Sequence, residues 1–159
     1  MRPIVRRSQV EEIPCLLLPL HGRTLLVPTV TVAEMVPMAP FHDEPETPDW
    51  FLGYFPWRGR QVPLLSFELL AGETEAEVVS KGRVAVLNNT GVSDELPFVA
   101  IPTLGLPRMS RVAAEDIKED TETPKRPFEL MRVKIGLEEM AIPDVTALER
   151  TYLDYRSRG

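Results

Sequence analysis

Residues 50–72, WFLGYFPWRGRQVPLLSFELLAG, constrain the fold of this chain most, because they join two apolar runs through one charged corner. The runs carry Trp, Phe, Tyr, Val and Leu, which fit a pleated surface, and Gly59 supplies the backbone freedom of a tight turn. The pattern predicts a strand, a turn and a second strand, with Arg58 and Arg60 at the tip. From composition alone, both arginines are solvated turn residues.

Length and proline content indicate the class of fold. The chain has 159 residues, of which 43% are hydrophobic and 26% charged. These values fit one globular domain, or two fused subdomains, with enough apolar material for a core. Sixteen prolines occur, many of them at the edges of apolar runs. Proline there stops helices and marks strand ends or edge strands, so an all-β class is expected.

Charge and cysteine usage exclude several classes of protein. The formal net charge is −6 and no Lys/Arg-rich run occurs, so we expect no nucleic-acid partner. The one cysteine, Cys15, allows no disulfide within the chain, which suits a reducing cytoplasm. No apolar stretch reaches the roughly 20 residues of a membrane span, and the N-terminus lacks the apolar region of a secretory signal. We therefore expect a cytoplasmic protein without membrane insertion.

The first half of the chain predicts one more hairpin and a long loop. Residues 15–20 and 24–27 flank a corner at Gly22 and read as two paired strands. Residues 30–35 fit a strand or a short helical turn equally well. Residues 37–49 hold four prolines and four acids, which is typical of a loop.

The second half predicts strands and a closing helix. Residues 113–126 are charged and are expected to be exposed, with at most one helical turn near 114–117. Apolar side chains at helical spacing predict a helix over residues 145–155, with Asp144 as its N-cap. Strands are expected over residues 83–88, 96–104, 131–137 and 138–142.

No pattern in the chain points to catalysis. His21 and His42 fall in predicted turns, without the spacing of a metal site. Cys15 lies in an apolar run, where an inert buried thiol is expected, so a Cys15–His21 nucleophilic pair is not predicted. No glycine-rich phosphate-binding motif occurs. We expect no cofactor and no enzymatic activity, and a β protein of this kind usually binds other proteins.

The spacing within residues 48–63 resembles the hallmark of the CheW family of chemotaxis adaptors. That hallmark runs as proline, aromatic, glycine, four residues, Arg-Gly, three residues and proline, which matches Pro48, Gly53, Arg58-Gly59 and Pro63 without a gap. Further stretches over roughly residues 12–153 are similar to the family's strands and helix: residues 16–36 with Glu34 before Met35, residues 83–88, residues 114–117 and residues 131–148. The sequence looks closest to adaptors of chemosensory systems that control type IV pili, such as ChpC.

Two positions depart from the family pattern. Ser66-Phe67 stands where the family commonly has Asp-Leu, and Thr103-Leu104 stands where it commonly has Val-Asp. Both changes remove an acid. They indicate a divergent member of the family and put the details of its partner contacts in question.

The resemblance implies a fold and a function. The fold is all-β, with two small five-stranded SH3-like β-barrels that share a hydrophobic seam, plus a C-terminal helix. Residues 12–155 form one domain between tails at 1–11 and 156–159. The function is that of a non-catalytic adaptor, which joins the cytoplasmic tip of a methyl-accepting chemoreceptor to the regulatory domain of a CheA-type histidine kinase.

The resemblance also assigns the protein-binding residues. An apolar groove between the barrels takes the helical tip of the receptor, and a barrel edge docks on the kinase. Glu34 and Arg58 supply the charges that orient these contacts, and Gly53 and Gly59 shape the hairpin that presents Arg58. The remaining residues assigned to the protein-binding surface are Val36 and Trp57.

Two other functions compete with the adaptor. An SH3-like or OB-like module for an unrelated peptide or an oligonucleotide would use an aromatic stacking platform. That platform would consist of Trp50, Phe51, Tyr54, Phe55 and Trp57. A small cytosolic enzyme would instead use His42 and the acidic loop over residues 37–49.

Overall fold

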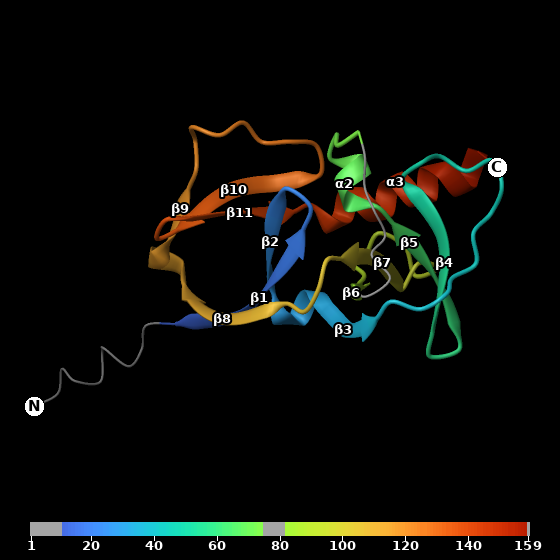
Figure 1. The fold of residues 1–159 in the computed structure, drawn as a ribbon, viewed down its shortest axis with the longest axis horizontal. Coiled ribbons are helices and arrows are strands. Elements are labelled where there is room, and N and C mark those ends of the chain that lie inside the picture. Colours follow the sequence, from blue (N-terminus) through green and yellow to red (C-terminus); the bar gives the residue numbers. More distant parts are fainter. Residues whose placement is uncertain (1–10, 75–81, 159) are drawn as a thin grey trace, which may run out of the picture.

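The computed structural model describes residues 11–74 and 82–158, which form two β-sheets and a long C-terminal helix (Figure 1). The first sheet has the strand order β8-β1-β2-β11-β10-β9. Its strands are β1 (Glu12–Leu20), β2 (Arg23–Pro28), β8 (Arg108–Ala113), β9 (Ile117–Glu119), β10 (Glu129–Ile135) and β11 (Glu138–Pro143).

The second sheet has the strand order β3-β6-β7-β5-β4. Its strands are β3 (Val32–Pro37), β4 (Phe51–Trp57), β5 (Arg60–Leu65), β6 (Arg83–Asn88) and β7 (Phe98–Thr103). The helical elements are η1 (Thr29–Thr31), α2 (Phe67–Leu70), η2 (Ala114–Asp116) and α3 (Val145–Arg158). Neighbouring strands are antiparallel, apart from the parallel pairs β2–β11 and β5–β7.

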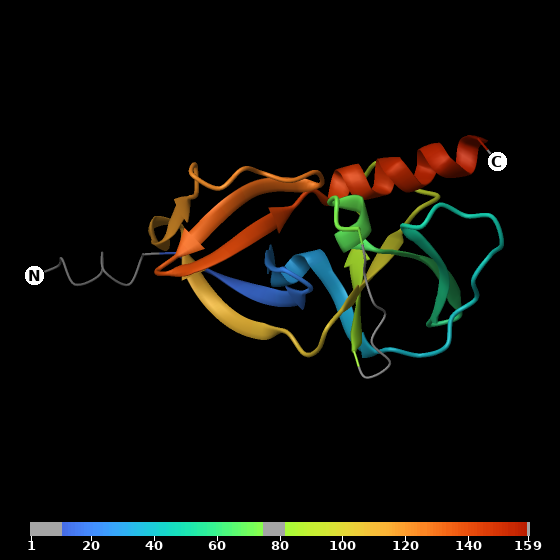
Figure 2. The same cartoon turned by 45° about the horizontal axis from the view of Figure 1, so that its top comes forward.

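A hydrophobic seam joins the two sheets, as expected. The largest buried cluster draws Leu18 and Leu25 from the first sheet, Phe51 and Ile101 from the second, and Leu148 from α3. Each sheet also encloses a smaller apolar cluster of its own. Figure 2 shows that α3 starts at the first sheet and runs along the second, so the helix closes the seam from one side. The predicted mostly-β class with a C-terminal helix is confirmed.

The C-terminal helix begins where the sequence predicts. Asp144 Oδ1 accepts a hydrogen bond from the Ala147 N–H at 3.1 Å, which satisfies a free donor of the first turn. Leu148 and Tyr152 are buried against the seam. The helix continues to Arg158, beyond the expected end at residue 155. The expected N-terminal tail, residues 1–11, lies almost wholly outside the described residues.

Two predicted elements differ from the structure, and one that the sequence left open is resolved. The run after Pro63 leaves the sheet at Leu65 and forms the short helix α2, because the Ser66 hydroxyl accepts the Leu69 N–H at 3.2 Å. The strand predicted over residues 96–104 starts at Phe98. The ambiguous residues 30–35 contain both alternatives, since η1 is followed directly by β3.

The first sheet has six strands rather than the five implied by the resemblance, and two of the six, β8 and β9, were not predicted from the sequence. β8 pairs with β1 over its whole length, with Glu12 opposite Ala113 and Leu17 opposite Arg108. The three-residue β9 pairs with β10 from the charged segment that was expected to be exposed.

Truncating a core leucine of β5 should destabilise the protein strongly. Leu64 is fully buried in the apolar cluster of the second sheet. We expect Leu64→Ala to lower the free energy of unfolding by about 3 kcal/mol, because the substitution leaves a cavity. Urea denaturation measures the change. The matched control is Leu137→Ala in the β10–β11 turn, where the leucine is 100% exposed and the change should stay within about 0.5 kcal/mol.

Candidate functional site

The β4–β5 hairpin ends in a two-residue turn made by Arg58 and Gly59. Trp57 pairs with Arg60 across the turn, and both turn residues have positive φ, 49° for Arg58 and 74° for Gly59. Positive φ at both positions matches the right-handed twist of the flanking strands. The predicted hairpin and the place of Arg58 at its tip are confirmed, whereas Arg60 is the first residue of β5.

Glu34 on β3 holds the hairpin tip through one carboxylate oxygen. Its Oε1 accepts hydrogen bonds from Trp57 Nε1 at 2.9 Å and from Arg58 Nε at 3.1 Å. Arg58 Nη2 lies 3.0 Å from the same oxygen. The Arg58 guanidinium also lies over the Trp57 ring, 5.2 Å from its centroid. We call Glu34, Trp57 and Arg58 the tip triad.

The tip triad shows that the second sheet curls until its edges meet. In the strand order, β3 and β4 are the two opposite edges. Glu34 lies on one edge and Trp57 on the other, yet the two side chains are hydrogen-bonded. Side chains therefore bridge the open edges, and sequence positions 23 residues apart form one surface feature.

The charged side chains of the tip triad face solvent. Hydrogen bonds from Trp57 and then from Arg58 lower the pKa of Glu34 below its ordinary value. The Arg58 side chain is 68% exposed, and that of Glu34 is 39% exposed. An ion pair this exposed contributes little to folding.

Two predicted site residues, Val36 and Trp57, also serve the packing of the second sheet. Val36 pairs with Val84 on β6 and contacts the apolar cluster inside the sheet. The Trp57 ring meets Phe98 edge-on, with centroids 4.8 Å apart. Both residues are partly buried.

Gly53 allows the loop before β4 to lie directly on that strand. His42 and Tyr54 exchange two backbone hydrogen bonds, of 2.9 and 2.7 Å. A Cβ on Gly53 would fall 2.3 Å from the His42 carbonyl oxygen, and Gly53 has φ +142°. The expected loop over residues 37–49 is therefore fastened to β4 at His42, and His42 contributes its backbone there.

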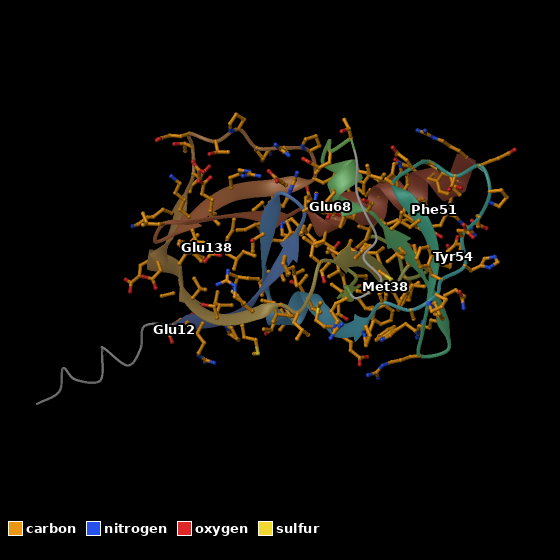
Figure 3. All side chains as sticks on the ribbon, in the orientation of Figure 1. Glu12, Met38, Phe51, Tyr54, Glu68 and Glu138 are labelled. Atoms are coloured by element: carbon orange, nitrogen blue, oxygen red, sulfur yellow. The ribbon has the colours of Figure 1, made fainter. Side chains whose placement is uncertain are left out.

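The prediction of an aromatic stacking platform is wrong. Phe51 and Phe55 are each only 2% exposed, because they lie in different apolar clusters. Tyr54 points toward α3, where its hydroxyl lies 2.7 Å from the Tyr152 hydroxyl and accepts a hydrogen bond from Arg156 Nη1 at 2.6 Å. Figure 3 labels Phe51 and Tyr54 on β4 beside α3. These aromatics hold the helix and leave no shared face for bases.

Sequence reasoning missed a buried charge cluster beneath the β1–β2 turn. Glu129 Oε2 accepts hydrogen bonds from Arg23 Nη1 at 2.6 Å and from Arg132 Nη2 at 3.0 Å. Glu129 Oε1 accepts from Arg132 Nε at 3.0 Å and from the Arg126 N–H at 2.8 Å. Arg23 Nη2 also pairs with Glu73, 3.1 Å away, in the segment after α2.

The buried charge cluster has no local sequence signal, because Arg23 and Glu129 are 106 residues apart. Arg23 falls between the two strands predicted over residues 15–20 and 24–27, but it belongs to β2 and is 8% exposed. Burial lowers the pKa of Arg23. Glu73 follows β5 and α2, so its ion pair with Arg23 links this end of the second sheet to β2 of the first sheet.

The described residues contain no candidate metal centre. Residues 11–74 and 82–158 contain no group of three or more His, Cys, Asp or Glu side chains that could hold a metal ion. Cys15 is buried, as predicted, and burial raises the pKa of its thiol. Within the same ranges, no helix is long and apolar enough to cross a membrane.

The two departures from the family pattern have structural roles. Ser66 caps α2, and an aspartate at this position would accept the same kind of hydrogen bond. Thr103 Oγ1 donates to the Gly105 carbonyl at 3.0 Å, and the Leu104 N–H donates to the Pro19 carbonyl at 2.9 Å. Ser66 is 2% exposed, so the acid lost there would have been a cap rather than a surface contact.

Comparisons with known proteins agree with this architecture. A family model described as the CheW-like domain matches residues 14–149. The scaffolding protein TtCheW from Thermoanaerobacter tengcongensis has a similar solved structure, with a TM-score of 0.70 and 14% sequence identity over 83% of this chain and 88% of that chain. No curated protein matches the chain significantly in sequence.

Proposed function

Because the chain belongs to the CheW-like domain family, we propose that it is a non-catalytic adaptor that couples methyl-accepting chemoreceptors to a CheA-type histidine kinase. The proposal places the protein in the cytoplasm, recruited to membrane-associated receptor arrays. Within that role, a link to type IV pili and twitching motility is the narrower prediction, which follows from the sequence resemblance.

The observation that carries the proposal is the exposed tip triad. Glu34 fixes Arg58 through Nε and Nη2. Arg58 Nη1 has no hydrogen-bond acceptor among the described residues. This nitrogen can therefore donate to a carboxylate of a partner protein. A guanidinium held by an ion pair and a ring face loses little freedom on binding.

Exposed apolar side chains on both crossovers between the sheets support a receptor contact. Val30 lies on η1, between β2 and β3, and Leu104 and Leu106 lie between β7 and β8. Met109 follows on β8, and its side chain is 76% exposed. Exposed apolar side chains are unfavourable in water and often mark interaction sites. On these connecting segments they could contact the apolar face of a helical receptor tip.

Reversing the charge of Arg58 should abolish partner binding without unfolding the protein. Arg58→Glu puts a like charge beside Glu34, so the hairpin tip loses its orientation and its positive charge. We expect the affinity for the kinase regulatory domain or for the receptor tip to fall at least about tenfold. Isothermal titration with each purified partner measures the loss, and circular dichroism should remain unchanged.

The charge swap Glu34→Arg/Arg58→Glu separates a partner contact from an internal one. If Arg58 touches a partner acid, the swap restores the internal pair but not the affinity; full restoration would contradict the contact. Lys125→Glu is the matched control, because Lys125 is exposed in the loop between β9 and β10, away from the tip triad and from both crossovers. A loss as large in this control would show that net charge alone matters.

A further inference from the structure

A hollow of about 480 Å³ opens where β5 and β7 diverge under α3. These parallel strands pair only at Leu64 and Ala100. The first half of β5 and the start of β7 therefore separate, and α3 spans the gap with Tyr152, Leu153 and Arg156. The volume lies within the ~300–1,000 Å³ typical of ligand pockets.

The hollow has an apolar floor and a positive rim. Val62, Leu96 and Tyr152 are buried in the floor, and the partly buried Phe98 forms a wall. Arg60 and Arg156 stand exposed at the rim. Glu95 is the one acid among the lining residues, so the rim has the sign opposite to the chain's net charge of −6.

Both rim arginines are held in place by aromatic neighbours. The Arg60 guanidinium lies over the Phe98 ring, 5.3 Å from its centroid. Arg156 Nη1 donates to the Tyr54 hydroxyl at 2.6 Å, and its guanidinium lies over the Tyr54 ring. A guanidinium has five N–H donors, so each arginine keeps donors for a carboxylate. Neither arginine forms an ion pair with a described acid.

We propose that this hollow binds a short extended segment of a partner protein that carries acidic side chains next to apolar ones. The carboxylates would meet Arg60 and Arg156 at the rim, and the apolar side chains would enter the floor. Charge complementarity favours a peptide over a nucleic acid, because two cations on an acidic protein neutralise too few phosphates. The hollow adjoins the tip triad, because its wall residue Phe98 contacts Trp57, but neither Glu34 nor Arg58 lines it.

The test is an NMR titration of the full chain with a blocked peptide, acetyl-Leu-Glu-Phe-Glu-Leu-amide. We expect saturable shifts of the backbone amides of Gln61, Val62, Phe98 and Leu153. The same peptide with glutamine in place of both glutamates should bind about tenfold more weakly, as should the Arg60→Gln/Arg156→Gln variant with the acidic peptide. Arg158→Gln, on the same exposed helix end but outside the hollow, should bind like the unchanged protein.

Three results would overturn the proposal. One is the absence of saturable shifts at millimolar peptide from a folded sample. Another is equal affinity for the acidic and the glutamine peptide, which would remove the role of the arginines. A third is an equal set of shifts with inorganic phosphate, which would reduce the hollow to a simple anion site. None of these results bears on kinase or receptor binding at the tip triad.

Discussion

Replacing Gly53 by alanine should lower the free energy of unfolding by about 4 kcal/mol. The new Cβ would lie 2.3 Å from the His42 carbonyl oxygen and 2.8 Å from the Asp43 Cα, and both neighbours are backbone. The loop must move away, and the two hydrogen bonds between His42 and Tyr54 then lengthen or break. The residue must also keep φ near +142°, which a side chain disfavours. Urea denaturation gives the change.

Gly59→Ala is the matched control for Gly53→Ala. Gly59 also has a positive φ, +74°, but a Cβ there meets nothing within 4 Å. Alanine at the hairpin tip should therefore cost only the backbone strain, about 1 kcal/mol. If the two substitutions cost the same, the loop yields freely at His42 and the close approach does not explain the glycine.

Turn chemistry made the hairpin the most predictable part of the fold. Trp57, Gly59 and the apolar runs on either side specify a strand, a tight turn and a strand without help from distant residues. The C-terminal helix was predictable for the same reason, because its cap at Asp144 and its apolar spacing are local signals. The family resemblance then supplied Glu34, which has no local signal of its own.

Other features depend on contacts between distant residues. β8 reads as irregular because Arg108 to Arg111 are all exposed, which leaves no alternation of buried and exposed residues. It forms because β1 offers it a complete edge. The pairing of Glu34 with Trp57 needs the curl of a whole sheet, and the hollow beside β5 needs a parallel strand to diverge. Neither can be read from spacing along the chain.

The departures from the family pattern affect partner binding less than the loss of two acids suggests. The acid missing at Ser66 would face the first turn of α2, where a serine caps equally well. The partner contacts that this position put in question are therefore better sought at the tip triad and on the crossovers. The buried charge cluster links β2 of the first sheet to the segment after α2 through the Arg23–Glu73 pair. It therefore helps to fix the relative orientation of the two sheets, which the proposed adaptor role requires.

Glu129→Gln should be one of the most destabilising substitutions in the chain, with a loss of about 4 kcal/mol at neutral pH. Both carboxylate oxygens of Glu129 accept two hydrogen bonds each, from Arg23, Arg132 and the Arg126 N–H. A glutamine presents an NH₂ group to one of these donor pairs, and the buried Arg23 charge keeps only the partly exposed Glu73 as an anionic partner. The melting temperature should fall by roughly 10 °C.

The stability lost in Glu129→Gln should be larger at neutral pH than at acid pH. Burial opposes the charged form, but hydrogen bonds from Arg132 and Arg126 outweigh it and lower the pKa of Glu129 below its usual 4.5. A lowered folded-state pKa stabilises the protein above the unfolded value and loses this contribution as the pH falls through the folded value. The gap in melting temperature between the unchanged protein and Glu129→Gln should therefore be full at pH 7 and should narrow on acidification below about pH 4.5. Glu138→Gln, which breaks the exposed pair with Arg108, should show almost no gap at either pH. A gap for Glu129→Gln that stays constant down to acid pH would mean that the shape of the side chain, and not its charge, holds the buried charge cluster together.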